Sequence, residues 1–458
     1  MSIHLPDRGR LSWGVASAAY QVEGAVDEDG RGTSIWDTFA ARPGAVVDGT
    51  DGAVACDSYH RLGEDVELVA GLGVDHYRFS IAWPRVQPTG SGPAEPRGLA
   101  YYERLVDTLL ARDISPMATL YHWDLPQPLE DRDGWLNRDT AERFAEYAAL
   151  VHERLGDRVR LWATHNEPWC TAYVGYGSGR HAPGRQEGGR THITAHHLLL
   201  GHGLAAARMH EAGADAVGIV LNLTPVWADR PEAAEVADGV DAIRNRVWLG
   251  PLVDGAYDEG TLRVAPVLAD PSVVREGDLD LVRGSADWLG VNYYTPARVD
   301  VPGDEGTGGG GGDAGVEEFP GVAPFRFTPR PPLTDIGWEV EPHGLEELLV
   351  STHRRTGLPL VVTENGAAFP DTARTEDGEV DDQDRIGYLD DHIAAVERAR
   401  EQGADVRGYV LWTLMDNFEW AEGYTKYFGV VHVDRDTLAR TPKASYHWYA
   451  ARVSAARG

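Results

Sequence analysis

The sequence is poor in cysteine and contains no long apolar run. Cys56 and Cys170 are the only cysteines, which excludes a disulfide framework and a CxxC metal clamp. No stretch of about 18 consecutive apolar residues is present, although a helix that spans a bilayer needs one. Residues 1–10 carry charged side chains without a long apolar stretch behind them, unlike a secretory signal. We therefore expect a cytoplasmic protein with reduced thiols.

Positive charge is scarce relative to negative charge. The chain has 42 lysine and arginine residues against 72 aspartate and glutamate residues, a formal net charge of −30. Lys426 and Lys443 are the only lysines. Such a charge repels the phosphates of nucleic acids and the surfaces of anionic membranes. We therefore exclude both as partners and expect a small neutral substrate, whereas no feature indicates an oligomeric state.

Eight apolar, strand-like runs are spread over the whole chain. Between most of them lie helix-like stretches with apolar residues three and four apart, at 57–72, 100–111, 138–155, 191–212 and 386–402. The strand-like runs lie at 11–16, 74–81, 115–121, 159–164, 217–223, 286–291, 358–363 and 406–411. Alternation of this kind indicates a parallel sheet, and eight units favour a closed (β/α)8 TIM barrel over an open doubly wound sheet.

We predict a single domain over residues 1–458, because no internal repeat and no Pro- or Ser-rich linker divides the chain. The one low-complexity segment, at 303–315, is rich in glycine and predicts a flexible surface loop. It contains a literal GxGxxG at 306–311. A dinucleotide site is rejected, since no strand leads directly into this segment and no helix follows it.

Two glutamates follow strand-like runs in short polar motifs. Glu167 lies in THNEP at 164–168, and Glu364 lies in VVTENG at 361–366. In a barrel the reacting groups lie at the carboxyl ends of strands. Glycoside hydrolysis needs one carboxyl group as proton donor and a second as nucleophile or base. Either glutamate alone could be a salt-bridge partner, but the two together favour paired acid chemistry.

Further polar and aromatic residues recur where the strand-like runs end. Any single one of them is more simply a structural hydrogen-bonding group, but their recurrence at seven or eight strand ends is difficult to explain by core packing. They are Gln21, Arg78, His122, Trp123, Asn166, Asn222, Asn292, Tyr294, Trp412 and Glu419.

A group of histidines raises the question of a metal. His192 and His196 would share one face of a helix, with His197 and His202 nearby. The zincin pattern requires a glutamate directly after the first histidine, where Ile193 stands. We therefore predict structural roles for these histidines and no metal site. The sequence also has neither a Walker loop nor a Gly-x-Ser-x-Gly elbow.

The chain resembles the family 1 glycoside hydrolases, the beta-glucosidase family, over nearly its whole length. Besides the two glutamate motifs, the matching segments are WGVASAAYQVEG at 13–24, YRFSIAW at 77–83, YHWDLP at 121–126, NYYT at 292–295 and WTLMDNFEW at 412–420. Leu11 departs from the phenylalanine that is usual in the family. The resemblance implies a (β/α)8 barrel that hydrolyses beta-glycosides with retention of configuration and without a metal or organic cofactor.

The same resemblance implies roles for individual residues. Glu167 would be the acid/base and Glu364 the nucleophile, with Arg78 and Tyr294 keeping Glu364 ionised and Asn166 contacting the 2-hydroxyl. The remaining predicted substrate-binding residues would hold hydroxyl groups, face the sugar ring or form the leaving-group side. They are Gln21, His122, Trp123, Asn222, Trp338, Trp412, Glu419, Trp420 and Phe428. Cys170 is expected to border the leaving-group side as well.

Glu419 separates two branches of the family. Phosphoglycosidases that resemble this chain have serine there, and a carboxylate would repel a 6-phosphate. We therefore expect a beta-glucosidase, with beta-galactosides and beta-fucosides as possible substrates, over a 6-phospho-beta-glucosidase. Two further alternatives are a catalytically inactive sugar-binding barrel, which usually lacks one of the glutamates, and a metal-dependent barrel hydrolase or isomerase.

Overall fold

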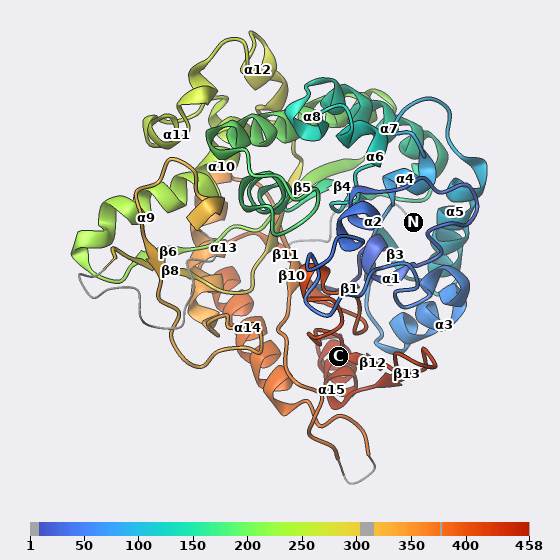
Figure 1. Ribbon diagram of the computed structural model, residues 1–458. Helices are drawn as coiled ribbons and strands as arrows, with labels where there is room; N and C mark the ends of the chain where they lie inside the picture. Colours follow the sequence, from blue (N-terminus) through green and yellow to red (C-terminus); the bar gives the residue numbers. More distant parts are fainter. Residues whose placement is uncertain (1–8, 303–315, 376–377, 458) are drawn as a thin grey trace.

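The protein folds around a closed barrel of eight parallel strands (Figure 1). The computed structural model describes residues 9–302, 316–375 and 378–457. Around the barrel the strand order is β1-β11-β10-β7-β5-β4-β3-β2. The strands are β1 (Ser12–Ala16), β2 (His76–Ser80), β3 (Ser115–Tyr121), β4 (Leu161–Asn166), β5 (Ala216–Leu221), β7 (Trp288–Asn292), β10 (Leu360–Asn365) and β11 (Val406–Trp412). Because β1 pairs with both β2 and β11, the sheet is closed, which confirms the predicted (β/α)8 barrel and excludes the open sheet.

All eight predicted strand-like runs are barrel strands. Their residues are almost all buried, because the inside of the barrel is filled by side chains and the outside is covered by helices. Two boundaries differ from the prediction in the same way. The runs at 159–164 and 358–363 correspond to β4 and β10, which both extend two residues further, into polar side chains.

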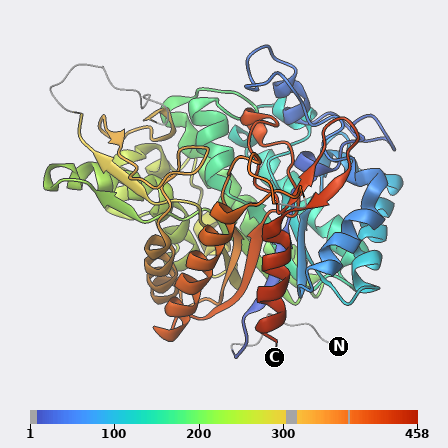
Figure 2. The same ribbon diagram turned by 90° about the horizontal axis from the view of Figure 1, so that it is seen from below.

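Helices cover the outside of the barrel (Figures 1 and 2). All five predicted helical stretches are present, as α3 (Ser58–Gly71), α5 (Pro96–Leu110), α7 (Asp139–Leu155), α8 (Thr191–Glu211) and α14 (Gln383–Glu401). The other α-helices are α1 (Ala19–Val22), α2 (Ile35–Ala40), α4 (Trp83–Val86), α6 (Gln127–Glu130), α9 (Ala234–Asp241), α10 (Val247–Asp254), α11 (Glu259–Val264), α12 (Asp278–Val282), α13 (Pro342–Thr356) and α15 (Ala444–Ala455). Among the described helices, none combines the length and apolar character that a membrane span requires.

Short elements lie in the connections between barrel strands. A small sheet joins β6 (Val226–Ala228), β8 (Ala297–Asp300) and β9 (Arg326–Phe327), and a hairpin pairs β12 (Val431–Val433) with β13 (Arg440–Pro442). Two π-helices are η2 (Cys170–Ser178) and η5 (Ala242–Arg246). The short 3-10 turns are η1 (Gly134–Leu136), η3 (Gly188–Arg190), η4 (Pro231–Ala233), η6 (Pro266–Ala269), η7 (Val316–Glu318) and η8 (Trp420–Glu422). The glycine-rich segment 303–315 lies outside the described residues.

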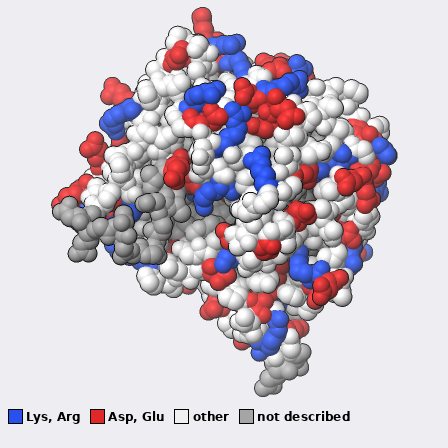
Figure 3. Space-filling model, viewed as in Figure 1, with Lys and Arg blue, Asp and Glu red and all other residues white. Residues whose placement is uncertain are grey.

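Charged side chains of both signs cover the surface. On the face seen in Figure 3, lysine and arginine side chains lie interspersed with aspartate and glutamate side chains. Many of these form ion pairs, such as Arg143 with Asp139 and Glu146 on α7. The surface in this view therefore resembles neither a uniformly basic nucleic-acid-binding face nor a membrane-binding one.

Candidate active site

The two glutamates lie at the carboxyl ends of barrel strands, where a barrel enzyme places its reacting groups. Glu364 is a residue of β10, and Glu167 directly follows β4. Both side chains are almost completely buried, with 5% and 3% of the surface of Glu167 and Glu364 exposed. Glu167 has a backbone φ of 45°. Residues other than glycine rarely adopt such an angle, and those that do are often found at functional sites.

Glu364 is held by two donors. Arg78 on β2 donates from Nη1 to Oε1 at 2.5 Å, and the Tyr294 hydroxyl donates to Oε2 at 2.6 Å. Arg78 is itself 1% exposed, so its charge acts on Glu364 with little screening by water. The structure thus brings both predicted partners of this carboxylate into direct contact with it.

Glu167 has different partners. Asn292, the last residue of β7, donates from Nδ2 to Oε1 at 2.8 Å. The Thr363 hydroxyl donates to Oδ1 of Asn292 at 2.7 Å, which fixes the amide with its NH2 group toward Glu167. The Cys170 thiol donates to Oε2 at 3.1 Å. Glu167 therefore has only uncharged hydrogen-bond donors among the described residues.

The two carboxyl groups differ in their electrostatics. Burial, followed by the charge of Glu364, raises the pKa of Glu167 to about 7. Burial also raises the pKa of Glu364, but Arg78, the Tyr294 bond and Asn292 act to lower it. The proton of the pair is therefore favoured on Glu167 and the negative charge on Glu364.

Asn166 forms hydrogen bonds to partners of both glutamates and lies within hydrogen-bonding distance of His122. Its Oδ1 accepts from Arg78 Nη2 at 2.6 Å and from Asn292 Nδ2 at 3.0 Å, and its Nδ2 lies 3.0 Å from Nε2 of His122. Because Arg78 can only donate, the Asn166 amide must present its NH2 group to His122. Burial and the Arg78 charge hold the pKa of His122 well below its ordinary value, so this imidazole is neutral. Trp123 donates from Nε1 to the Asn166 carbonyl at 2.9 Å.

Gln21 and Glu419 form a second polar group near the glutamates. Gln21, on α1, donates from Nε2 to Oδ1 of Asn417 at 3.0 Å, to the Phe418 carbonyl at 2.9 Å and to Oε2 of Glu419 at 3.4 Å. Its Oε1 is buried and has no hydrogen-bond partner among the described residues, so it can accept a bond from a ligand. Burial, with the charge of Glu364, raises the pKa of Glu419 to about 8.

Aromatic rings line the site in two groups. In the first group, the ring centroids of Trp412 and Trp420 lie 5.9 and 5.7 Å from the centroid of the His122 imidazole. The ring centroid of Trp123 lies 4.4 Å from that of Trp420. The second joins Tyr294, Trp338 and Phe428, whose centroids are 5.2 to 6.2 Å apart. Flat apolar surfaces of this kind cover the C–H faces of ring-shaped ligands.

Asn222, which follows β5, lies beside Glu167. Its Nδ2 donates to the Cys170 sulfur at 3.5 Å, and the thiol in turn donates to Glu167. Hydrogen bonds thus connect Glu167, Glu364, Arg78, Asn166, Tyr294, His122, Trp123 and Asn222 into one network at the carboxyl ends of the strands. Two residues beside Glu167 were absent from the predicted site. Asn292 was marked only as a strand-end residue, and Arg244 on η5 carried no motif that could have revealed it.

The histidines that raised the question of a metal have separate partners. His192 lies 3.0 Å from the Tyr173 hydroxyl, and the His196 Nε2 lies 3.0 Å from Asp278. His197 bonds to the Trp135 carbonyl. They form no common coordination sphere, and the structure agrees with the predicted structural roles.

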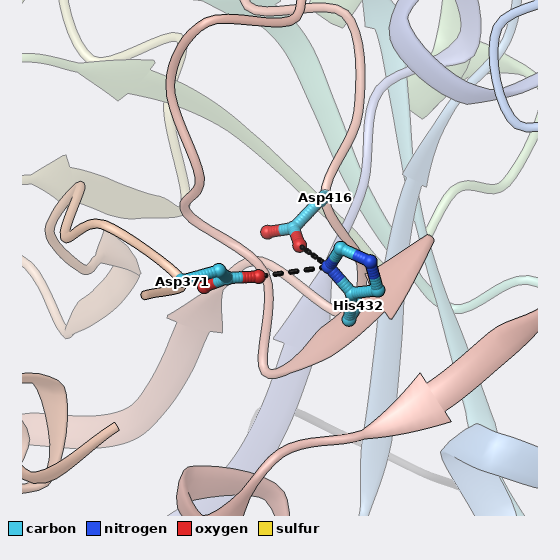
Figure 4. A group of neighbouring side chains, drawn as sticks. All are labelled: Asp371, Asp416 and His432. Carbon is cyan, nitrogen blue, oxygen red and sulfur yellow. Dashed lines mark hydrogen bonds and ion pairs between the residues drawn. The ribbon is translucent and has the colours of Figure 1, made fainter. Parts of the chain in front are cut away.

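Another cluster, Asp371, Asp416 and His432, has the residue types of a cation site (Figure 4). Nδ1 of His432 lies 2.8 Å from Asp371 and 3.5 Å from Asp416. The ammonium group of Lys443 bridges the two carboxylates at 2.7 and 2.9 Å. Because a lysine charge already lies between these oxygens, a metal ion there would be repelled. These residues therefore form an internal ion-pair cluster.

Comparisons with known proteins agree with this geometry. The model of glycosyl hydrolase family 1 matches residues 5–457. The chain is 47% identical over 440 residues to "Thermostable beta-glucosidase B" of Thermobispora bispora, covering 95% of this chain and 88% of the relative. It is 45% identical to "Bifunctional beta-D-glucosidase/beta-D-fucosidase" of Bifidobacterium breve, covering 95% and 96%.

Solved structures give the same result. The psychrophilic beta-glucosidase BglU from Micrococcus antarcticus superposes with a TM-score of 0.92 at 44% identity, covering 99% of this chain and 98% of the other. The beta-glucosidase from Thermotoga maritima in complex with noeuromycin gives a TM-score of 0.90 at 38% identity, covering 99% and 100%. A family match over nearly the whole chain, together with a barrel that places the two glutamates at the carboxyl ends of its strands, establishes that this chain belongs to glycosyl hydrolase family 1.

Proposed function

We propose that the protein is a retaining beta-glucosidase that removes terminal non-reducing beta-D-glucosyl residues through a covalent glycosyl-enzyme intermediate. One observation carries the proposal. The charge of one buried carboxyl group, Glu364, acts on a second, Glu167, and only Glu364 has a cation bonded to it. Retaining hydrolysis needs this division, with one carboxylate ready to attack and one carboxylic acid ready to donate a proton.

In the first half-reaction, Glu364 attacks the anomeric carbon while Glu167 protonates the departing glycosidic oxygen. Glu364 then loses its charge in the new ester bond, which removes the main charge that raises the pKa of Glu167. Glu167 therefore gives up protons more readily in the intermediate and can act as the base that activates water. The electrostatic link between the two groups lets one residue serve both half-reactions.

The sugar-binding side favours an unphosphorylated sugar. Gln21 offers a free acceptor, and Glu419 adds a carboxyl group beside it. Lys426 is already paired, since its ammonium group donates to the carbonyl and carboxylate of Asp335 at 2.9 and 3.1 Å. Burial and the charge of Glu364 raise the pKa of Glu419 to about 8. Neither Gln21 nor Glu419 supplies a cation to balance a phosphate dianion, which argues against a 6-phospho-beta-glucosidase.

Substrates with a glucose or 6-deoxygalactose ring are both compatible with this pocket. The relative from Bifidobacterium breve is named for both glucosidase and fucosidase activities, and one from Thermotoga neapolitana is named "1,4-beta-D-glucan glucohydrolase". We extend these activities to this chain as a proposal, with cellobiose and short cellulose fragments as natural substrates. A cytoplasmic location, expected from the sequence, fits such small soluble substrates.

The test uses Glu167→Gln and a series of beta-glucosides with different leaving groups. A dinitrophenolate leaves with little protonation, so its glucoside should retain first-step activity, while cellobiose should lose about 10²- to 10⁴-fold in kcat/KM. A glycosyl-enzyme intermediate should then accumulate and be detected by mass spectrometry. Equal losses in kcat/KM for all leaving groups, or an unchanged rate with cellobiose, would show that Glu167 is not the acid/base. A wild-type preference for the 6-phosphoglucoside would contradict the neutral-sugar assignment.

A further inference from the structure

The Cys170 thiol forms a hydrogen bond to one oxygen of Glu167, and this is the oxygen to which we assign the acidic proton. Asn292 donates to Oε1 of Glu167, so Oε1 must act as an acceptor and the acidic proton is assigned to Oε2. Oε2 is the oxygen that the Cys170 sulfur approaches at 3.1 Å. Every proton that Glu167 gives to a glycosidic oxygen, or takes from water, therefore passes beside this thiol.

The sulfur is held in place from two directions. The backbone N–H of Cys170 donates to the Glu167 carbonyl at 2.9 Å at the start of η2, a π-helix, an uncommon form that occurs often at functional sites. Asn222 Nδ2 donates to the sulfur at 3.5 Å. Because the sulfur accepts from Asn222, its own S–H is free to rotate toward Glu167 or away from it. Burial raises the pKa of this thiol well above its ordinary value, so it remains a donor.

We propose that Cys170 is a positioning residue for the acid/base group: its thiol donates to Oε2 of Glu167 when that carboxylate is ionised and releases this oxygen when it carries the proton. The inference rests on the proposed role of Glu167. In the first half-reaction Glu364 bonds to the anomeric carbon as the C–O bond breaks, the Oε2 proton moves to the departing glycosidic oxygen, and the S–H turns toward the new carboxylate. In the second, water adds to the anomeric carbon as the ester bond to Glu364 breaks, its proton moves to Oε2, and the S–H turns away.

A thiol suits this exchange because it is a weak donor and a weak acceptor. A permanent charged donor would hold Glu167 ionised and weaken it as an acid. Five charged or titratable groups act on Glu167 from separate elements. They are Glu364 on β10, Cys170 on η2, Tyr294 after β7, Glu419 after β11 and Arg244 on η5. Of these, Cys170 bonds directly to the acid/base carboxyl group.

The experiment measures kcat/KM for p-nitrophenyl beta-glucoside against pH, where the alkaline limb reports the acid in the free enzyme. Cys170→Ala removes a donor to the ionised form, so the limb should move to higher pH by about half a unit. Cys170→Ser restores a donor and should move the limb back toward or below the wild-type position. Cys56→Ala, which changes the only other cysteine, should leave the limb in place.

A spectroscopic measurement avoids changing Cys170. In Cys56→Ala the S–H stretching band belongs to Cys170 alone, and it should move to lower frequency as pH rises through the alkaline limb. An unmoved band, or identical limbs for wild type and both Cys170 variants, would overturn the proposal. Glu167→Gln separates this outcome from failure of the proposed function. If that variant keeps the wild-type limb, Glu167 is not the acid; if it loses the limb while Cys170→Ala does not move it, only the role of Cys170 fails.

Discussion

Two close pairs of carboxyl groups lie in this protein, and they are arranged in opposite ways. Asp371 and Asp416 share the ammonium group of Lys443, and the imidazole of His432 is a second partner (Figure 4). Glu167 and Glu364 have one bonded cation between them, Arg78, and it contacts Glu364 alone. The number and position of the cations thus distinguish the structural pair from the reactive pair.

The pKa values follow from that difference. Burial and mutual repulsion raise the pKa of Asp371, but Lys443 and His432 outweigh burial at Asp416 and hold its pKa below the ordinary value. In the active site burial raises the pKa of both Glu167 and Glu364, and the pKa of Glu167 reaches about 7. The cations beside Asp416 favour its ionised form, so this pair can hold loops together by charge. A pair that lacks one cation keeps a proton near neutral pH, which is the condition for acid catalysis.

The largest expected effect comes from removing the carboxyl group that attacks. Glu364→Ala should lower kcat for p-nitrophenyl beta-glucoside on the order of 10⁴-fold or more, as expected for loss of a catalytic nucleophile. Azide or formate should restore part of the activity, and the azide product should have the alpha configuration. The matched change in the other pair, Asp371→Asn, should retain most of kcat. Near-normal activity of Glu364→Ala without an added anion would contradict the assignment.

The second effect concerns stability and compares the only two lysines of the chain. Lys443 is fully buried and bridges two carboxylates, so Lys443→Met leaves uncompensated buried charge and should cost about 3–5 kcal/mol in the free energy of unfolding. Lys426 and Asp335 have 20% and 32% of their side chains exposed. Lys426→Met should therefore cost less than about 1 kcal/mol. Urea unfolding of both variants measures the difference, and equal losses would refute the comparison.

A third carboxyl group, Glu419, tests the sugar side of the active pair. Glu419→Ser removes an acceptor for buried hydroxyls and should cost about 1–3 kcal/mol in transition-state binding, or one to two powers of ten in kcat/KM for the glucoside. The 6-phosphoglucoside should lose less, because Glu419 can stand beside a phosphate dianion only if it stays protonated, and the same change removes that cost. The test is the ratio of kcat/KM for the glucoside to kcat/KM for the 6-phosphoglucoside. If Glu419→Ser leaves this ratio unchanged, Glu419 does not select neutral sugars.

The barrel could be predicted from the sequence because its strands are apolar runs and its helices have regular apolar spacing. The prediction ended β4 and β10 two residues early, where His165, Asn166 and Glu364 continue the strand with polar side chains. Polarity usually marks the end of a strand, but here the pocket needs polar groups in strand geometry. The short strands of the β6-β8-β9 sheet were missed, since two to four residues carry no clear periodicity.

Most members of the site and the two partners of Glu364 could be predicted, but the partners of Glu167 could not. Motifs revealed Glu167 and Glu364, whereas the bond from Asn292 to Glu167 joins residues 125 positions apart and depends on the order of strands in the barrel. The cluster around Lys443 was not predicted at all. Its members lie on separate loops and strands, and each alone is an ordinary charged residue. Sequence patterns indicate which side chains are available, but the closure of the barrel decides which of them meet.

The smallest expected effect is a pH-dependent loss of stability in the structural pair. Hydrogen bonding to Asp416 and Asp371 raises the pKa of His432 above its ordinary value of about 6.5. Such a histidine adds stability that is fully present below pH 6.5 and is lost as pH rises through the folded pKa. His432→Gln should therefore lower Tm most at acidic pH, and the difference from wild type should narrow toward pH 9. The side chain is 28% exposed, so the loss should stay below about 1 kcal/mol. His210→Gln breaks a more exposed pair with Asp287 and should change Tm less at acidic pH. A Tm difference for His432→Gln that is constant or grows with pH would show that the imidazole is uncharged in this cluster and that Lys443 alone balances the two carboxylates.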